Sequence, residues 1–143
     1  TRNPSPTTGQ LPMTTRDAVF PAGRNELFIK HSYSAAIRSG DFLFVSGHVG
    51  SHSDGSPEPD FEAQVRLAFA NLQATLKAGG CVLDDIVYVT SFHSNPEKQF
   101  DTVLAVKNEV FSAAPYPTWT ALGVNWLAGF DFEIKVIARI GAA

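Results

Sequence analysis

The chain has 143 residues, 44% hydrophobic and 17% charged, a balance typical of one globular domain that can bury a core. Its formal net charge of -3 and its scattered basic residues do not favour a nucleic-acid partner. With one cysteine, Cys81, and no apolar run near the roughly 18 residues of a membrane span, we expect no internal disulfide, no membrane association and a cytoplasmic location.

The N-terminal segment differs from the rest of the chain. Residues 1–12 contain prolines and threonines without apolar periodicity, and Met13 follows directly. We interpret residues 1–12 as a flexible tail or an expression remnant, and residues 13–143 as a single domain without internal repeats.

Short strands are predicted in the next part of the chain. Residues 26–30 and 34–38 have strand-like composition, and a turn at residues 39–41 leads into the β-rich run 42–46. Together they predict an antiparallel hairpin. The loop that follows, residues 51–59, is rich in serine, glycine, proline and aspartate.

An amphipathic helix is predicted over residues 61–78. Asp60 is placed to cap its N-terminus, and Gly79 with Gly80 closes it. Its apolar residues recur at helical spacing and predict a buried face: Phe61, Val65, Ala68, Phe69, Leu72 and Leu76.

The second half of the chain predicts a strand, a helix and two more strands. Residues 86–92 are β-branched and aromatic, and Asn95 then precedes a proline that suits the first position of a helix over residues 96–112. The final strands are predicted at residues 117–122 and 132–138. The residues expected to face inward from the helix are Phe100, Val103, Leu104, Val110 and Phe111.

The resulting order, β-β-α-β-α-β-β, predicts an α+β fold with two helices on one face of a sheet. In the last strand, alternation places Glu133 and Lys135 opposite Ile134 and Val136. The face without helices is therefore expected to bind a partner subunit.

Two segments resemble the Rid family, also called YjgF-like, RutC-like or L-PSP endoribonuclease-like. Residues 32–37 (SYSAAI) are similar to its Pro-Tyr-Ser-Gln-Ala-type strand, and residues 40–48 (GDFLFVSGH) to the strand that ends in Ser-Gly-Gln. The resemblance covers nearly everything after Met13. It is closest to the YjgH-type branch through residues 20–24 and 123–133.

The resemblance implies a chorismate-mutase-like fold, with a mainly antiparallel sheet whose helices pack on one face. It also implies a homotrimer with an inner barrel, small-molecule clefts at the subunit interfaces, and no metal or cofactor. In the deaminase branches, an arginine in a Pro-Ala-Arg-Ser motif clamps the substrate carboxylate. A glutamate in the last strand holds the water that attacks the imine carbon, and ammonia leaves.

This chain departs from the deaminase pattern at the arginine. Residues 117–120 read Pro-Thr-Trp-Thr, so Trp119 stands at the arginine position. Tryptophan has one N–H donor and no charge, and a hydrogen bond with a charged group contributes about 1.5–3 kcal/mol. A carboxylate clamped there would lose about 10²-fold in affinity, so a 2-imino acid is not expected to be a good substrate.

The remaining site residues follow from the resemblance. Glu133 matches the water-holding glutamate and is the predicted catalytic residue, while Tyr33, Ser46 and Gly47 match the pocket. Leu104 and Ala121 replace residues that the deaminases often carry as asparagine and cysteine. The predicted substrate-binding set, which favours a flat, neutral or weakly polar ligand, is Tyr33, Ser46, Gly47, Leu104, Trp119, Thr120 and Ala121.

Other interpretations stay open for several residues. Glu133 also fits a solvated position on the open sheet face, and Trp119 fits packing at a subunit interface. Cys81 is more typical of a small buried residue than of a nucleophile. The four histidines fall in predicted strands and loops, so even the spacing of His48 and His52 does not put two imidazoles on one helical face. The acidic residues 54–62 lack the order of a calcium loop.

Three functions are consistent with these patterns. The first is a deaminase or hydrolase of an imine, an enamine or a related reactive metabolite, with a specificity altered by Trp119. The alternative is a non-catalytic trimer that binds a small ligand. An endoribonuclease or translation inhibitor is a third reading, and the acidic balance of the chain disfavours it.

Overall fold

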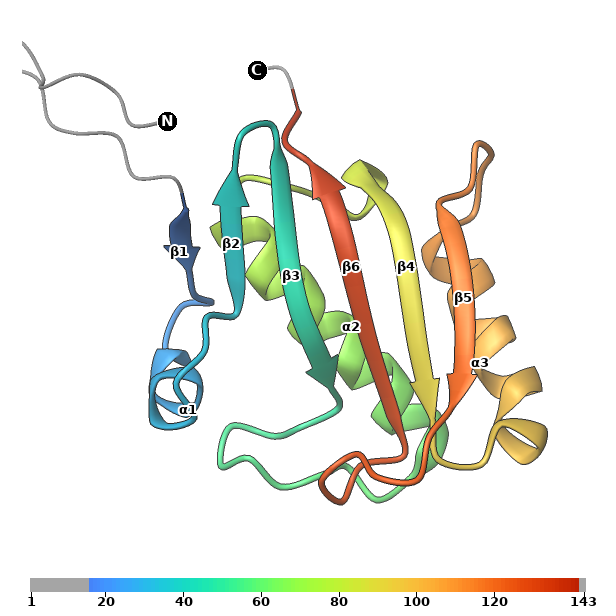
Figure 1. Ribbon diagram of the computed structural model, residues 1–143. Coiled ribbons are helices and arrows are strands. Elements are labelled where there is room, and N and C mark those ends of the chain that lie inside the picture. The colour runs from blue at the N-terminus through green and yellow to red at the C-terminus, as the bar shows by residue number, and fades with distance from the viewer. Residues whose placement is uncertain (1–15, 142–143) are drawn as a thin grey trace, which may run out of the picture.

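In the computed structural model, residues 16–141 are described, so the predicted tail at residues 1–12 lies outside the described residues. Six strands form one sheet in the order β1-β2-β3-β6-β4-β5 (Figure 1). All neighbours are antiparallel except β4 and β5, which are parallel. The strands are β1 Asp17–Val19, β2 Ala36–Ser39, β3 Phe42–Val49, β4 Ile86–His93, β5 Thr118–Gly123 and β6 Phe132–Arg139.

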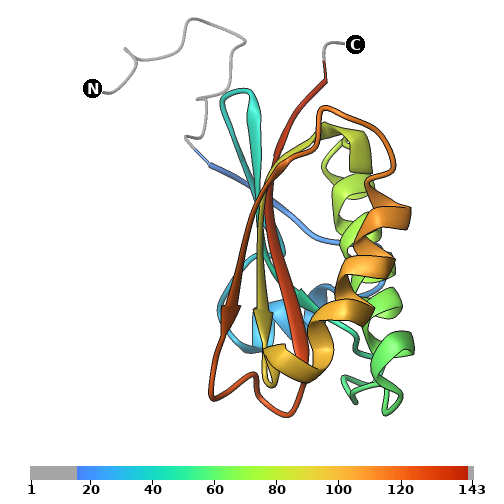
Figure 2. The same cartoon turned by 90° about the vertical axis from the view of Figure 1, so that its right-hand side faces the viewer.

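The helices are α1 Asn25–Lys30, α2 Phe61–Ala78 and α3 Pro96–Val110, with a short 3-10 turn at Leu83–Asp85. Seen edge-on, α2 and α3 lie on one face of the sheet (Figure 2). From β2 onward the order is β-β-α-β-α-β-β, so the predicted α+β fold is confirmed. Among the described residues, no helix combines the length and apolar composition needed to cross a bilayer.

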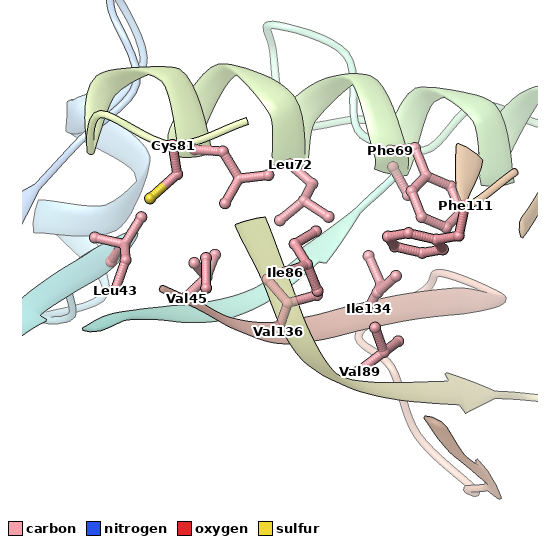
Figure 3. Close-up of a cluster of buried hydrophobic side chains, with 14 of the residues drawn as sticks. Leu43, Val45, Phe69, Leu72, Cys81, Ile86, Val89, Phe111, Ile134 and Val136 are labelled. Carbon is pink, nitrogen blue, oxygen red and sulfur yellow. The ribbon is translucent and has the colours of Figure 1, made fainter. Parts of the chain in front are cut away.

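The α2 helix forms where its periodicity and end signals predict it. The side chain of Asp60 accepts a hydrogen bond from the Ala63 N–H at 3.0 Å, and Gly80 adopts φ 82° just beyond the last turn. Its apolar face packs onto side chains of β3, β4 and β6, including Leu43, Val45, Ile86, Val89 and Val136 (Figure 3). Burying one leucine of this face stabilises the fold by about 2 kcal/mol.

The prediction of a strand over residues 26–30 is wrong, because this segment forms helix α1. The segment is too short to show a period. Glu26 lies in the first turn and Lys30 in the last, which suits the helix dipole. The ring of Phe28 packs against Tyr33 at 5.2 Å and His48 at 6.1 Å between centroids, so tertiary packing overrides strand propensity.

Three smaller differences have local causes. Strand β1 was missed because three residues show no alternation. Helix α3 ends at Val110 instead of residue 112. Asn95 precedes it without a side-chain cap bond, and its backbone N–H donates to the Gln99 side chain. Phe100 is not buried as predicted but lies at the protein edge, stacked on Trp119.

The other sheet face carries no helix in the described part of the chain (Figure 2). The predicted alternation in β6 is confirmed, because Ile134 and Val136 are buried while Lys135 is exposed and Glu133 half-buried. Phe44, Tyr88 and Leu122 each expose 45% of their surface. Large apolar side chains that stay exposed in this way mark surfaces available for association.

Candidate functional site

A cavity of about 800 Å³ opens near the C-terminal end of β3. It lies among α1, the end of β3, the start of β6 and the loop between β5 and β6, the lower part of the molecule in Figure 1. Its apolar wall includes Leu27, Phe28, Val124, Trp126, Leu127 and Phe130. The residues with polar side chains that line it are Arg24, His31, Tyr33, His48, Ser51, Asn71 and Glu133. An apolar cavity with a few polar groups is the usual form of a small-molecule site.

Glu133 and Gly47 meet at a bulge in β3. Val45 pairs with Val136 and His48 with Ile134, so three steps along β3 oppose two along β6. Gly47 lies within this bulge. A Cβ atom added to Gly47 would overlap the carboxylate of Glu133, so only glycine leaves that space for the side chain.

The carboxyl group of Glu133 has no hydrogen-bond or ion-pair partner within residues 16–141. Burial raises its pKa above the ordinary range, and the positive charge of Lys135 opposes this shift. An incompletely solvated carboxylate without a partner is a strong proton acceptor, and it holds a water molecule well.

Tyr33 lies beside this carboxyl group. Burial is the larger cause that raises the pKa of the Tyr33 phenol, and the negative charge of Glu133 raises this pKa further. The phenol therefore lies within the electrostatic reach of the carboxylate. The residue before it, Ser32, has φ 61°, and Ala128 on the cavity wall has φ 54°. Both are strained left-handed conformations for residues other than glycine, and such strain clusters at functional sites.

His48 forms part of the cavity floor and is held in one state. Its Nδ1 lies 2.7 Å from the Ser46 carbonyl oxygen, and its Nε2 lies 2.7 Å from Thr75 Oγ1. Because the carbonyl oxygen only accepts, Nδ1 carries the proton and Nε2 accepts from the threonine hydroxyl. Burial lowers the pKa of His48, which keeps the ring neutral. The ring of His48 therefore holds the β3 bulge in place. It has no free lone pair with which to accept a hydrogen bond from a substrate.

Arg24 was not singled out from the sequence, yet it lies on the cavity wall. Its guanidinium group donates to Asn71 Oδ1 at 2.8 Å, to Ser51 Oγ at 3.0 Å and to the His52 carbonyl oxygen at 3.0 Å. These partners come from the loop after β3 and from α2. No sequence pattern links residues so far apart, so contacts in the fold were needed to find this one.

Of the substrate-binding residues predicted from the resemblance, Tyr33 and Gly47 line this cavity together with Glu133. Ser46 lies just behind it, where its hydroxyl donates to the Ser34 carbonyl oxygen at 2.7 Å and its N–H to Ala35 at 2.9 Å. The remaining predicted residues lie on β5 and α3 and do not line the cavity of their own chain: Leu104, Trp119, Thr120 and Ala121.

Trp119 points toward the helices. It pairs with the buried Val89, and its Nε1–H donates to Ser91 Oγ at 2.8 Å. Its ring stacks on Phe100 with centroids 5.5 Å apart, and the Lys107 ammonium lies 4.3 Å from the ring centroid. Thr120 points to the open face beside Thr90, whereas Ala121 and the half-buried Leu104 lie at the exposed edge.

Comparison with known proteins identifies the family. The family model described as Endoribonuclease L-PSP matches residues 23–140. The chain belongs to this family. Its members are also known as RutC, YjgF or Rid proteins, so the resemblance inferred from the sequence is confirmed.

Individual relatives agree with this membership. The chain is 71% identical over 128 residues to RutC family protein YjgH of Escherichia coli K12, covering 90% of this chain and 98% of that protein. A solved structure of a YjgH protein has a TM-score of 0.86 and 69% identity, covering 91% of this chain and 100% of that one. A 2-iminobutanoate/2-iminopropanoate deaminase of Dermatophagoides farinae is 28% identical over 94 residues, covering 64% of this chain and 72% of that protein.

Proposed function

We propose that this protein is a Rid-like hydrolase that deaminates a small imine or enamine, or a related reactive metabolite, in this cavity. The observation that carries the proposal is the Glu133 carboxylate. It lies at an apolar cavity above Gly47, and it has no partner among the described residues. The deaminase relative in Dermatophagoides farinae supports the same class of reaction.

The reaction follows from one carboxylate and one water molecule. Glu133 takes a proton from the water as its oxygen attacks the imine carbon, and the protonated Glu133 returns that proton to the imine nitrogen, which gives a carbinolamine. Glu133 then takes the hydroxyl proton as the carbonyl forms and passes it to the amine nitrogen. The C–N bond breaks with its electron pair on nitrogen, ammonia leaves, and Glu133 is ionised again. An enamine first becomes the imine by gaining a proton on carbon and losing one from nitrogen, and then follows the same route.

Trp119 supports a specificity different from that of 2-imino acid deaminases. Its N–H is already donated to Ser91, and its ring is occupied by Phe100 and Lys107. It therefore has no donor or charge available for a carboxylate attached to the imine carbon. This observation also favours the second candidate, a trimer that binds a small ligand without turnover.

We further propose a homotrimer in which the open sheet faces form an inner barrel. Across β3, β6 and β4, the residues Phe44, Ile137 and Tyr88 stand in one row on that face, and a trimer would remove them from water. The exposed or half-buried residues Leu104, Thr120 and Ala121 would then complete a cleft with the neighbouring subunit, whereas Trp119 stays packed on Phe100 and Lys107. A solution mass near three times the 15.4 kDa of one chain is expected by light scattering, and the mass of one chain would contradict it.

An endoribonuclease is less consistent with the cavity, although the family carries that description. Arg24 is the only permanently charged cation among the described residues that line it. Binding along an RNA strand relies on several lysines and arginines. We expect the protein to act in the cytoplasm on a small molecule instead.

The test is ammonia release from imines generated in solution, with and without a carboxylate on the imine carbon. The wild-type protein is compared with Glu133→Ala and with Lys77→Ala, an exposed helix residue outside the cavity. Turnover of imines that lack that carboxylate, lost in Glu133→Ala and kept in Lys77→Ala, is the expected result. No ammonia above the spontaneous rate from any imine would refute catalysis and favour the binding trimer.

A further inference from the structure

Arg24 gives the cavity a fixed positive charge at a distance from Glu133. Its side chain is half-buried, and its two terminal nitrogens are held by Asn71, Ser51 and His52. Every one of these acceptors is a neutral oxygen. Its Nε–H has no partner among the described residues and is the donor left for a ligand. The guanidinium group is thus oriented but not neutralised.

This arrangement differs from that of Arg66. Arg66 lies on the exposed surface, yet it pairs with Glu62 at 3.1 Å and with Glu109 at 3.0 Å. Arg24 is less exposed and has no carboxylate within ion-pair distance in residues 16–141. A partly desolvated guanidinium without a counter-ion attracts an anion more strongly than an exposed one does.

The positive and negative groups act on different parts of the cavity. The charge of Arg24 contributes to lowering the pKa of His48, after burial, so its field reaches the cavity floor. Glu133 lies over the neighbouring Gly47, whereas the guanidinium group of Arg24 is held against α2 and the loop after β3. The two side chains line one cavity without forming an ion pair with each other, so a ligand can contact each one separately.

We propose that Arg24 binds the anionic group of the substrate, and that the substrate is a small acid whose anionic group is separated by several bonds from the imine or carbonyl carbon. The position of that carbon beside Glu133 rests on the proposed function. The anion site itself does not, because it depends only on Arg24 and its neutral partners. A 2-imino acid has its carboxylate directly on the reacting carbon and does not span the two groups.

The test is equilibrium binding, measured by calorimetry without turnover. Levulinate, a keto acid with two methylene groups between ketone and carboxylate, is compared with its neutral amide and with pyruvate. The variants are Arg24→Gln and, as a control with the same change of charge, Lys77→Gln on the exposed face of α2. Wild-type protein is expected to bind levulinate more tightly than the amide or pyruvate, by about 10-fold or more.

Arg24→Gln is expected to weaken levulinate binding by about 10- to 100-fold and to leave the amide unchanged, while Lys77→Gln changes neither. Equal binding of acid and amide by the wild-type protein would overturn the proposal. So would a folded Arg24→Gln that binds levulinate normally. If that variant does not fold, Arg24→Lys, which keeps the charge, is compared across the same acid and amide pair. A protein that fails to release ammonia but binds acids through Arg24 would refute the proposed function alone.

Discussion

Replacing Gly47 by alanine is expected to disable the Glu133 carboxyl group while leaving the fold in place. The added Cβ atom overlaps that carboxylate and nothing in the backbone. Gly47 is not among the residues with positive φ, so alanine adds no backbone strain. The conflict is confined to the end of a flexible side chain, which rotates away from the bulge.

The expected magnitudes separate catalysis from stability. Moving a reacting group by about 1 Å costs about 10²-fold in rate, and losing a general base costs about 10²- to 10⁴-fold. Turnover in Gly47→Ala should therefore fall by about 10²-fold or more. The free energy of unfolding should change by less than about 1 kcal/mol, because alanine also restricts the unfolded chain by about 0.4–1 kcal/mol.

The assay combines ammonia release with urea unfolding of the same samples. Gly141→Ala is the matched control, since a Cβ atom there meets only Asp85 at 3.7 Å. A double variant, Gly47→Ala with Glu133→Ala, should be no slower than Glu133→Ala alone. Full turnover in Gly47→Ala, or a further loss in the double variant, would refute the idea that the glycine acts by making room for this carboxylate.

Three further outcomes follow from the structure. Because burial raises the folded-state pKa of Glu133, the stability that it contributes is full at low pH and is lost as pH rises through that pKa. Glu133→Gln should therefore raise the melting temperature at pH 7 and not at pH 4, and a decrease at pH 7 would contradict this. Trp119→Arg places a second cation beside Lys107 and removes the bond to Ser91, so it should destabilise by about 2–4 kcal/mol in urea unfolding. Adding Lys107→Met to Trp119→Arg should recover part of the lost free energy of unfolding. No recovery would exclude repulsion between the two cations as a cause of the destabilisation. Tyr88→Lys on the open face should reduce the solution mass to one chain with the fold kept by circular dichroism, and an unchanged mass would contradict the barrel.

The elements that the sequence predicted well are those with long local signals. Helix α2 has 18 residues, a capping aspartate and a closing glycine pair, so its bounds were predicted to the residue. Helix α1 has 6 residues, fewer than two turns, and its conformation depends on the packing of Phe28 against Tyr33 and His48. Such contacts leave no period in the sequence.

The same distinction applies to the candidate site, where local motifs predicted some residues and only the contacts in the fold revealed others. Glu133, Gly47 and Tyr33 could be proposed because local motifs carry the family resemblance. Arg24 could not, because its importance lies in partners 27 to 47 residues away and in the absence of a nearby carboxylate. The orientation of the Trp119 side chain could not be predicted from the sequence either, since it depends on a hydrogen bond to Ser91 in the adjacent strand.

The most direct test of the account is the pH dependence of ammonia release by the wild-type protein and by Glu133→Gln, with the spontaneous rate subtracted. We expect the wild-type rate to fall at low pH with an apparent pKa above that of an ordinary glutamate, since burial raises the pKa of Glu133 and only its ionised form accepts the proton. The Glu133→Gln variant should release ammonia only at the spontaneous rate. A Glu133→Gln variant that turns over at the wild-type rate, with the same fall at low pH, would contradict the assignment of Glu133 as the group that activates water.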